Sequence, residues 1–325
     1  MTTTTTTPSR AGTVARGLLR GQNALLLGVL ALIAITVTAV NPNFLKLNNV
    51  VSIFQQVSVL GILTMAMALA LISGGIDLSI GMIMALSGVV VSTLISAGQP
   101  VWLAVLVGIL AATLCGLVNG VIISLTKTMP LIITLGMSGV YFGIALVISG
   151  GQFMGFDGAF DFIGRTRIAG VFPATLIFLF VVVALMYVLL NHTRFGRRVV
   201  AIGGNEDNAY LSGIRVNRYK TVVYMIGGAL AGVASIVLVS RLDSIVATVG
   251  TGYELSALTA AVIGGVTFEG GRGTVGGAFI GVILMGVISN AMTVLSVNSY
   301  VQTAVTGGII VVAVILSNVG KMRRT

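Results

Sequence analysis

A chain of 325 residues that is 56% hydrophobic and only 8% charged lies far from soluble domains, in which about a quarter of the residues are charged. Its mean hydropathy of +1.09 excludes an ordinary soluble domain and indicates a polytopic α-helical membrane protein. The formal net charge of +10 is typical of lysine and arginine held in cytoplasmic loops, so it does not indicate nucleic-acid binding.

The chain divides into one long apolar region and two polar tails. Residues 1–22 are polar and threonine-rich, and they predict a disordered cytoplasmic tail followed by an uncleaved first span. Residues 23–318 form the predicted transmembrane permease domain, with a charged loop at 191–220. Residues 319–325 form the predicted C-terminal cytoplasmic tail.

The apolar region contains ten runs that approach the length of a membrane span, which is about 20 residues. They lie at 23–40, 50–72, 79–97, 101–124, 130–149, 172–190, 221–239, 254–268, 273–293 and 299–317. We therefore expect an all-α polytopic membrane protein with about ten transmembrane helices. The run at 50–72 contains two glutamines and the run at 254–268 is short, so eight spans remain an alternative if both are re-entrant.

The basic residues predict the orientation of these spans. If both termini are cytoplasmic, fourteen of the 18 lysines and arginines fall inside and only Lys46, Arg165, Arg167 and Arg241 fall outside. This distribution follows the positive-inside rule and requires an even number of spans.

The first connection inside the permease domain is "SGGIDLSIG" at residues 73–81. It places Asp77 between two apolar runs, where a carboxylate is costly and is by default a functional residue. The alternative that we favour is a cap at the cytoplasmic membrane edge, with Asp77 capping a helix that starts at Leu78 and with Gly74 and Gly75 forming the turn.

Uncharged polar side chains within the spans are candidates for a translocation path. The four that need the most hydrogen bonds are Gln55, Gln56, Asn119 and Asn290. An uncharged polar solute needs hydrogen-bonding partners rather than ion pairs along its route. The alternative role for each of these residues is a hydrogen bond between packed helices.

A weak internal repeat supports an arrangement in two halves. Residues 116–140 align with residues 286–310, which pairs Asn119 with Asn290. Each segment has an apolar helix, a short polar break and another helix. Two pseudo-repeated halves are typical of transporters whose repeats meet around a central path.

The charge of the chain is concentrated in residues 191–220, which hold six basic and two acidic side chains. Within this loop, Asn205 is a predicted N-cap, and Glu206 and Asp207 occupy the favourable first turn of a short helix. Gly213 is predicted to end it in a left-handed conformation, and Asn217 offers a second cap for the next span.

A helix of about seven residues does not persist alone in water. We therefore expect a docking surface for a cytoplasmic partner, formed by Gly203, Gly204, Asn205, Glu206, Asp207, Leu211, Ser212 and Gly213. The alternative is an ordinary basic loop that fixes topology.

Nothing in the sequence predicts catalysis or metal binding. Cys115 lies within an apolar run, and His192 is the only histidine. The segment "GGRGTVGG" at residues 270–277 lacks the lysine ending and the preceding strand of a phosphate-binding loop. We expect no cofactor in this chain.

Several of these segments together resemble the ribose-type permeases of bacterial ABC sugar importers, within the branched-chain amino acid/sugar permease family. The resemblance lies in "SGGIDLSIG", "GGNEDNAYLSGIRVNRYK", "TGYELSALTAAVIGG", "GGRGTVGGAFIGV" and "NSYVQTAVTGGIIVVAV". It implies that residues 203–213 are a coupling helix that docks on an ATPase subunit. Asp207 and Asn208 depart from the family, which often has alanines there.

The resemblance also implies the partners. Two ATPase subunits bind ATP and Mg²⁺, a periplasmic sugar-binding protein delivers the solute, and a second permease copy, identical or related, completes the path in the bacterial inner membrane. The expected function is thus monosaccharide import, of a ribose-like pentose or a hexose, without enzymatic activity in this chain. The alternatives are a branched-chain amino acid permease and a stand-alone secondary transporter. A membrane-embedded enzyme is disfavoured by the lack of a catalytic cluster.

Overall fold

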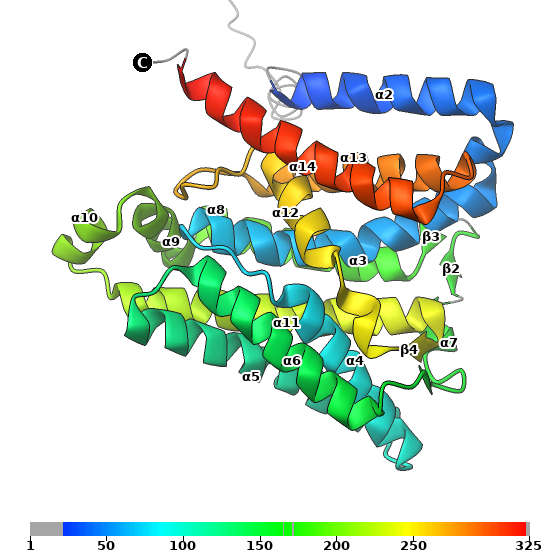
Figure 1. Cartoon of the computed structure of the whole chain (residues 1–325), viewed down its shortest axis with the longest axis horizontal. Coiled ribbons are helices and arrows are strands. Elements are labelled where there is room, and N and C mark those ends of the chain that lie inside the picture. The colour runs from blue at the N-terminus through cyan, green and yellow to red at the C-terminus, as the bar shows by residue number, and fades with distance from the viewer. Residues whose placement is uncertain (1–21, 165, 171, 323–325) are drawn as a thin grey trace, which may run out of the picture.

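The computed structural model describes residues 22–164, 166–170 and 172–322, which fold into long helices running back and forth along one axis (Figure 1). Nearly all of the predicted tail at 1–22 lies outside the described residues. Helix α14 continues to Met322, into the C-terminal tail predicted at 319–325, and the cytoplasmic location of that tail stays a prediction.

Twelve helices of six residues or more are described. They are α2 (Gln22–Val40), α3 (Leu47–Ile72), α4 (Ile80–Ser96), α5 (Val101–Thr126), α6 (Pro130–Ser149), α8 (Thr175–His192), α9 (Arg194–Gly204), α10 (Glu206–Leu211), α11 (Val216–Leu242), α12 (Tyr253–Ile263), α13 (Val275–Val294) and α14 (Ser299–Met322).

Short elements gather at the end of the molecule opposite α10 (Figure 1). They include η1 (Pro42–Leu45) and α7 (Asp161–Gly164), whereas η2 (Ala247–Gly250) packs against the start of α4 at Gly81. Strand β1 (Met154–Gly155) pairs antiparallel with β4 (Ser244–Ile245), and β2 (Arg167–Ile168) pairs with β3 (Phe172–Pro173).

Each of the ten predicted apolar runs coincides with a helix. Among the described residues, six helices are long and apolar enough to cross a membrane, namely α3, α5, α6, α8, α11 and α13. The run at 50–72 is a continuous part of α3, whereas α12 has only 11 residues. A helix of that length is about 16 Å long, so it does not span the roughly 30 Å hydrocarbon core alone.

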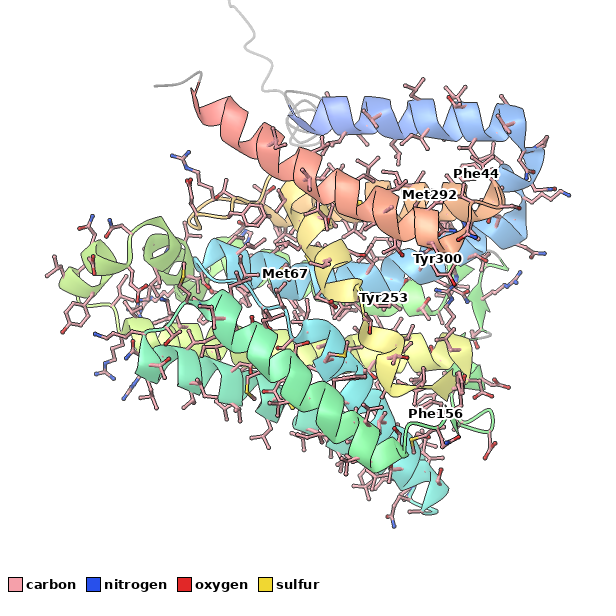
Figure 2. The ribbon with its side chains drawn as sticks, in the orientation of Figure 1. Phe44, Met67, Phe156, Tyr253, Met292 and Tyr300 are labelled. Atoms are coloured by element: carbon pink, nitrogen blue, oxygen red, sulfur yellow. The ribbon has the colours of Figure 1, made fainter. Side chains whose placement is uncertain are left out.

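Helix α3 is the centre of the fold. Its most apolar window is 89% buried, against 22% for α5 and 17% for α6. Met67 of α3 is fully buried (Figure 2). Side chains such as Leu110, Leu114 and Val147 on α5 and α6 are instead more than half exposed. This distribution places apolar surface on the outside, as a bilayer requires.

Glycines bring α5 and α11 into the closest contact between two spans. A Cβ atom on Gly228 would lie 2.9 Å from the Cα atom of Gly116, and one on Gly120 would lie 2.7 Å from the Cα atom of Thr221. Small residues at helix crossings permit such backbone approach, which strengthens packing in lipid.

We expect Gly228→Ala to destabilise the protein by about 1–3 kcal/mol, because the added methyl group meets the backbone of α5. Thermal unfolding of the purified chain in detergent measures this effect. Gly139→Ala on α6 is the matched control, since its methyl group meets no atom within 4 Å. Equal midpoints for the two variants would show that the close crossing does not limit stability.

Candidate coupling and translocation sites

The predicted short helix in the charged loop is α10, and both of its ends are fixed by hydrogen bonds. The Asn205 side chain accepts a hydrogen bond of 2.8 Å from the Asn208 backbone N–H, which confirms the predicted cap. Glu206 and Asp207 lie in the first turn, and Gly213 has φ +80°. The prediction for Asn217 is wrong, because α11 already begins at Val216 with Arg215 at the N-cap position.

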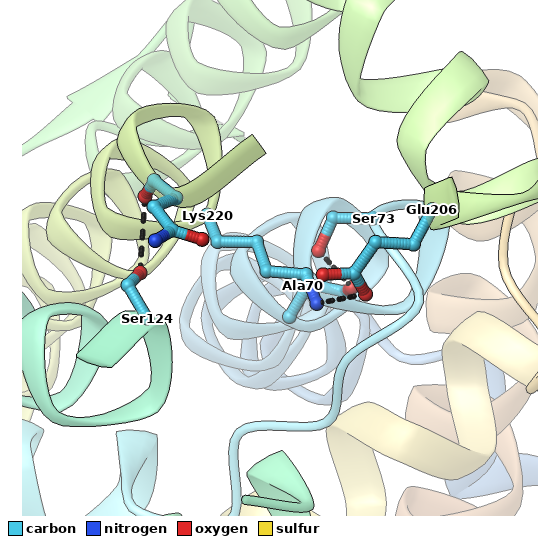
Figure 3. Close-up of polar contacts among 6 residues, drawn as sticks. Ala70, Ser73, Ser124, Glu206 and Lys220 are labelled. Atoms are coloured by element: carbon cyan, nitrogen blue, oxygen red, sulfur yellow. Dashed lines mark hydrogen bonds and ion pairs between the residues drawn. The ribbon is translucent and has the colours of Figure 1, made fainter. Parts of the chain in front are cut away.

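Two contacts hold α10 against the rest of the protein. Its inner face buries Ala209 against Ile202 of α9 and Val216 of α11. On the other side of the helix start, the Lys220 ammonium group contacts the Glu206 carboxylate at 2.5 Å (Figure 3). The Lys220 side chain is 15% exposed and the Glu206 side chain is 52% exposed, so water reaches this pair from the side of Glu206.

The outer face of α10 has no partner within the described chain that covers it. Tyr210 is 70% exposed and Leu211 is 80% exposed. A cleft of about 960 Å³ separates α10 from the connection between α5 and α6, at Lys127 and Thr128. The short helix therefore stands out from the end of the molecule, as Figure 1 shows, and presents apolar side chains to its surroundings.

Behind α10, three chain connections cross backbone to backbone. The Gly271 N–H donates a 2.9 Å hydrogen bond to the Ile72 carbonyl oxygen. A Cβ atom on Gly270 would lie 2.7 Å from the Cα atom of Gly74, and one on Gly271 would lie 2.6 Å from the Cα atom of Gly204. We call this crossing the glycine junction; it consists of Gly74, Gly203, Gly204, Gly270 and Gly271.

The glycine junction joins segments that the charge distribution placed on one side of the membrane. It links the end of α3, the end of α9 and the connection between α12 and α13. At the C-terminal end of α3, the Ser73 hydroxyl donates to the Ala70 carbonyl oxygen at 2.7 Å (Figure 3). The residues just before α10 thus contact two connections that are distant in sequence.

Asp77 is buried with 1% exposure and belongs to a chain of polar side chains. Its Oδ1 atom accepts hydrogen bonds from the Ser79 N–H at 3.0 Å and the Ser79 hydroxyl at 2.6 Å. Among the described residues, its Oδ2 atom has no hydrogen-bond partner. Helix α4 begins at Ile80 and not at Leu78, so Asp77 closes a turn just before the helix.

Asn119 lies at the centre of this polar chain. Its Nδ2 group donates to the Ser79 hydroxyl oxygen at 2.7 Å, and the Tyr141 hydroxyl lies 2.8 Å from its Oδ1 atom. Asn119 is completely buried and Tyr141 is 3% exposed. The network joins α5 and α6 to the segment before α4, which is the geometry of the packing alternative. The sequence did not predict that Ser79 and Tyr141 are the hydrogen-bond partners of Asn119.

The other three candidates for the path lie on the interfaces of α3. Asn290 of α13 and Asn49 of α3 exchange two amide hydrogen bonds of 2.9 and 3.0 Å. Gln56 donates to the Ser289 hydroxyl at 2.9 Å, and Gln55 donates to the Gly164 carbonyl oxygen at 3.3 Å. The structure therefore brings Gln56 and Asn290 to one interface and places Asn119 in a separate network.

A second carboxylate inside the fold, Glu254, is half-buried and lies in the first turn of α12. Its Oε1 atom accepts a 3.2 Å hydrogen bond from the Gly252 N–H, and its Oε2 atom has no partner among the described residues. The described ranges contain no group of three His, Cys, Asp or Glu residues placed to hold a metal ion.

These features define a helical membrane protein with a short helix that projects from one end. A family described as "Branched-chain amino acid transport system / permease component" matches residues 49–314, and the chain belongs to this family. Two relatives are named ribose import permease protein RbsC. That of Bacillus subtilis is 38% identical over 88% of this chain and 90% of its own, and that of Escherichia coli K12 is 37% identical over 90% and 92%.

A third relative is the D-allose transport system permease protein AlsC of Escherichia coli K12. It is 38% identical over 89% of each chain. No solved structure matches this chain.

We expect Asn119→Leu to lower the thermal unfolding midpoint, because the Ser79 and Tyr141 hydroxyls each lose a buried partner at a cost of about 1–3 kcal/mol. Gln55→Leu is the control, since Gln55 is half-buried and makes one long hydrogen bond. Thermal unfolding in detergent compares the two. An Asn119→Leu variant with parental stability and impaired transport would favour the path role.

Proposed function

We propose that this chain is the transmembrane permease subunit of an ATP-driven ABC importer for a monosaccharide in the bacterial inner membrane. Two ATPase subunits bind ATP and Mg²⁺, and a periplasmic binding protein delivers the sugar. A second permease copy, identical or related, completes the translocation path. The family membership and the relatives named for import of ribose and allose support this function.

The observation that carries the coupling role is the construction of α10. A six-residue helix is unstable alone in water, yet α10 is capped at Asn205, stopped at Gly213 and clamped by Lys220. Its outer face exposes Tyr210 and Leu211. A rigid projection with exposed apolar side chains suits a groove on an ATPase subunit.

The glycine junction gives this coupling helix a route into the membrane domain. In our proposal, ATP-driven displacement of α10 moves Gly203 and Gly204 against the connections at Gly74 and Gly271. Those connections lead into α4 and α13, whose neighbouring polar side chains include Asn119 and Asn290. Gln55, Gln56, Asn119 and Asn290 remain our candidates for the path, exposed when the interfaces that now bury them open.

We propose ten crossings with both termini cytoplasmic. The order of a long helix, a break, a short helix and two further helices occurs at α3–α6 and again at α11–α14. The two series run in opposite directions along the long axis (Figure 1), as expected for inverted repeats. The ends of α2 and α14 that carry the two termini lie at the same end of the molecule as α10.

Orientation is tested by chemical labelling. In a Cys115→Ala background, we expect Arg198→Cys to react with a membrane-impermeant maleimide only after the membrane is opened, because the loop at 191–220 is cytoplasmic. Gln99→Cys, in the exposed connection between α4 and α5, is the control and should react in intact cells. The reverse pattern would invert the proposed topology.

Coupling is tested at the glycine junction. Gly203→Ala places a methyl group against the backbone of Ile72 and Gly271, whereas Gly204→Ala meets no atom within 4 Å. We expect Gly203→Ala to reduce sugar uptake and binding-protein-stimulated ATP hydrolysis at least about ten-fold, a loss equal to roughly 1.4 kcal/mol. Gly204→Ala should remain near parental activity in the reconstituted importer.

If both variants assemble and have equal activity, the glycine junction is not part of the coupling route.

Co-purification of an ATPase subunit separates the importer from a stand-alone secondary transporter. Binding of labelled ribose, allose and leucine to the partner binding protein separates sugar import from branched-chain amino acid import.

A further inference from the structure

A pocket of about 510 Å³ lies between α9 and the start of α11, at the same end of the molecule as α10. Figure 2 shows nitrogen-tipped side chains gathered at this end. The residues of the pocket used below are Phe195, Arg198, Arg215, Arg218, Tyr219 and Val222. The volume is within the range of small-molecule sites, roughly 300–1,000 Å³.

The pocket is strongly positive. It is lined by three arginines and by no acidic residue. Arg215 and Arg218 also border the neighbouring cleft that contains Glu206 and Asp207, and Glu206 is paired there with Lys220. Arg215 and Arg218 have no ion-pair partner among residues 22–164, 166–170 and 172–322. The positive end of the 27-residue helix α11 adds to the same field.

One arginine of the pocket is held in a fixed orientation. The Arg198 guanidinium group donates a hydrogen bond to the Tyr219 hydroxyl and lies 5.5 Å from the centre of that ring. The Phe195 and Tyr219 rings are 5.6 Å apart. A guanidinium fixed by an aromatic ring keeps its remaining N–H groups available for an oxyanion.

The pocket is also apolar along one side, and that side follows a membrane span. Arg215, Arg218, Tyr219 and Val222 recur at helical spacing, so they form one stripe along the first two turns of α11. The stripe changes from charged at the end of the helix to apolar toward the membrane. A ligand that matches it carries an anionic group on an apolar body.

We propose that this pocket binds the phosphate group of an anionic phospholipid, with the guanidinium groups of Arg198, Arg215 and Arg218 on the phosphate oxygens. The apolar part of the lipid lies along Tyr219 and Val222. Basic pockets beside spanning helices on the cytoplasmic side suit such head groups. The lipid holds the start of α11, and with it α10, at a fixed depth in the membrane.

Two other ligands match the charge of the pocket but not the pocket as a whole. A free phosphate ion matches the arginines but leaves the aromatic and aliphatic side without a partner. An acidic segment of the ATPase subunit docks more readily on the exposed side chains Tyr210 and Leu211 of α10, neither of which lines the pocket. The inference requires only that α11 spans the membrane, and it is independent of the transported sugar.

The test is lipid binding to the full-length purified chain, measured by native mass spectrometry during titration with phosphatidylglycerol or phosphatidylcholine. Each arginine near an anionic lipid contributes a factor of about five in affinity, so Arg215→Gln/Arg218→Gln should weaken phosphatidylglycerol binding about twenty-fold. The matched control is Arg194→Gln/Arg197→Gln, which removes the same charge from α9 outside the pocket. This control should weaken binding less than about three-fold, and Arg215→Lys/Arg218→Lys should retain most of the affinity.

Three outcomes would overturn the proposal. Equal weakening by the pocket pair and the control pair would indicate diffuse attraction of lipid to the whole loop. Competition by glycerol 1-phosphate at the same concentration as phosphatidylglycerol would indicate a free-phosphate site. The Arg215→Gln/Arg218→Gln variant could also lose ATPase binding in phosphatidylcholine nanodiscs while its lipid binding stays unchanged. That result would assign the pocket to the protein partner. The experiment does not measure sugar uptake, so a failure of the lipid proposal is distinguishable from a failure of the proposed importer function.

Discussion

The backbone contact at the glycine junction is the constraint on which the coupling arrangement that we propose depends. Three connections approach so closely that side chains on Gly203, Gly270 or Gly271 would collide with backbone atoms. Backbone contacts of this kind do not adjust by rotamer changes, so the connections move together or separate. In our proposal the junction lets a helix as short as α10 act at a distance, because the residues before it contact the end of α3 and the connection between α12 and α13.

The interior of the membrane domain meets a second constraint, which is that buried polar groups need partners where water is absent. Asn119, Ser79 and Asp77 satisfy it together, as do Asn49 and Asn290. Among the described residues, the exceptions are one oxygen atom each of Asp77, Thr175, Ser235 and Glu254. The two acids lie just before α4 and in the first turn of α12, whereas Thr175 is the first residue of α8 and Ser235 lies within α11.

Sequence patterns predicted those features of the fold that depend on local chemistry. Apolar runs located each long helix, and the residue types at Asn205 and Gly213 fixed both ends of α10, because caps and left-handed turns are set by a few neighbouring atoms. The partners of Asn119 were not predictable, since Ser79 and Tyr141 are distant in sequence. Asn217 was misassigned because Asn is favoured as a cap, yet the N-cap of α11 is Arg215, two residues earlier.

The concentration of charge in residues 191–220 follows from several distinct tasks within one segment. A topological signal alone requires only that basic residues be present on one side. Lys220, however, is largely shielded and pairs with Glu206, and Arg198 is fixed over Tyr219. These two residues have defined geometry, whereas Arg194 and Arg197 are exposed and outside the pocket. The basic loop therefore combines an orientation signal on α9 with a clamp and an anion pocket at the start of α11, and the clamp and pocket border the helix that we propose transmits ATP-driven movement.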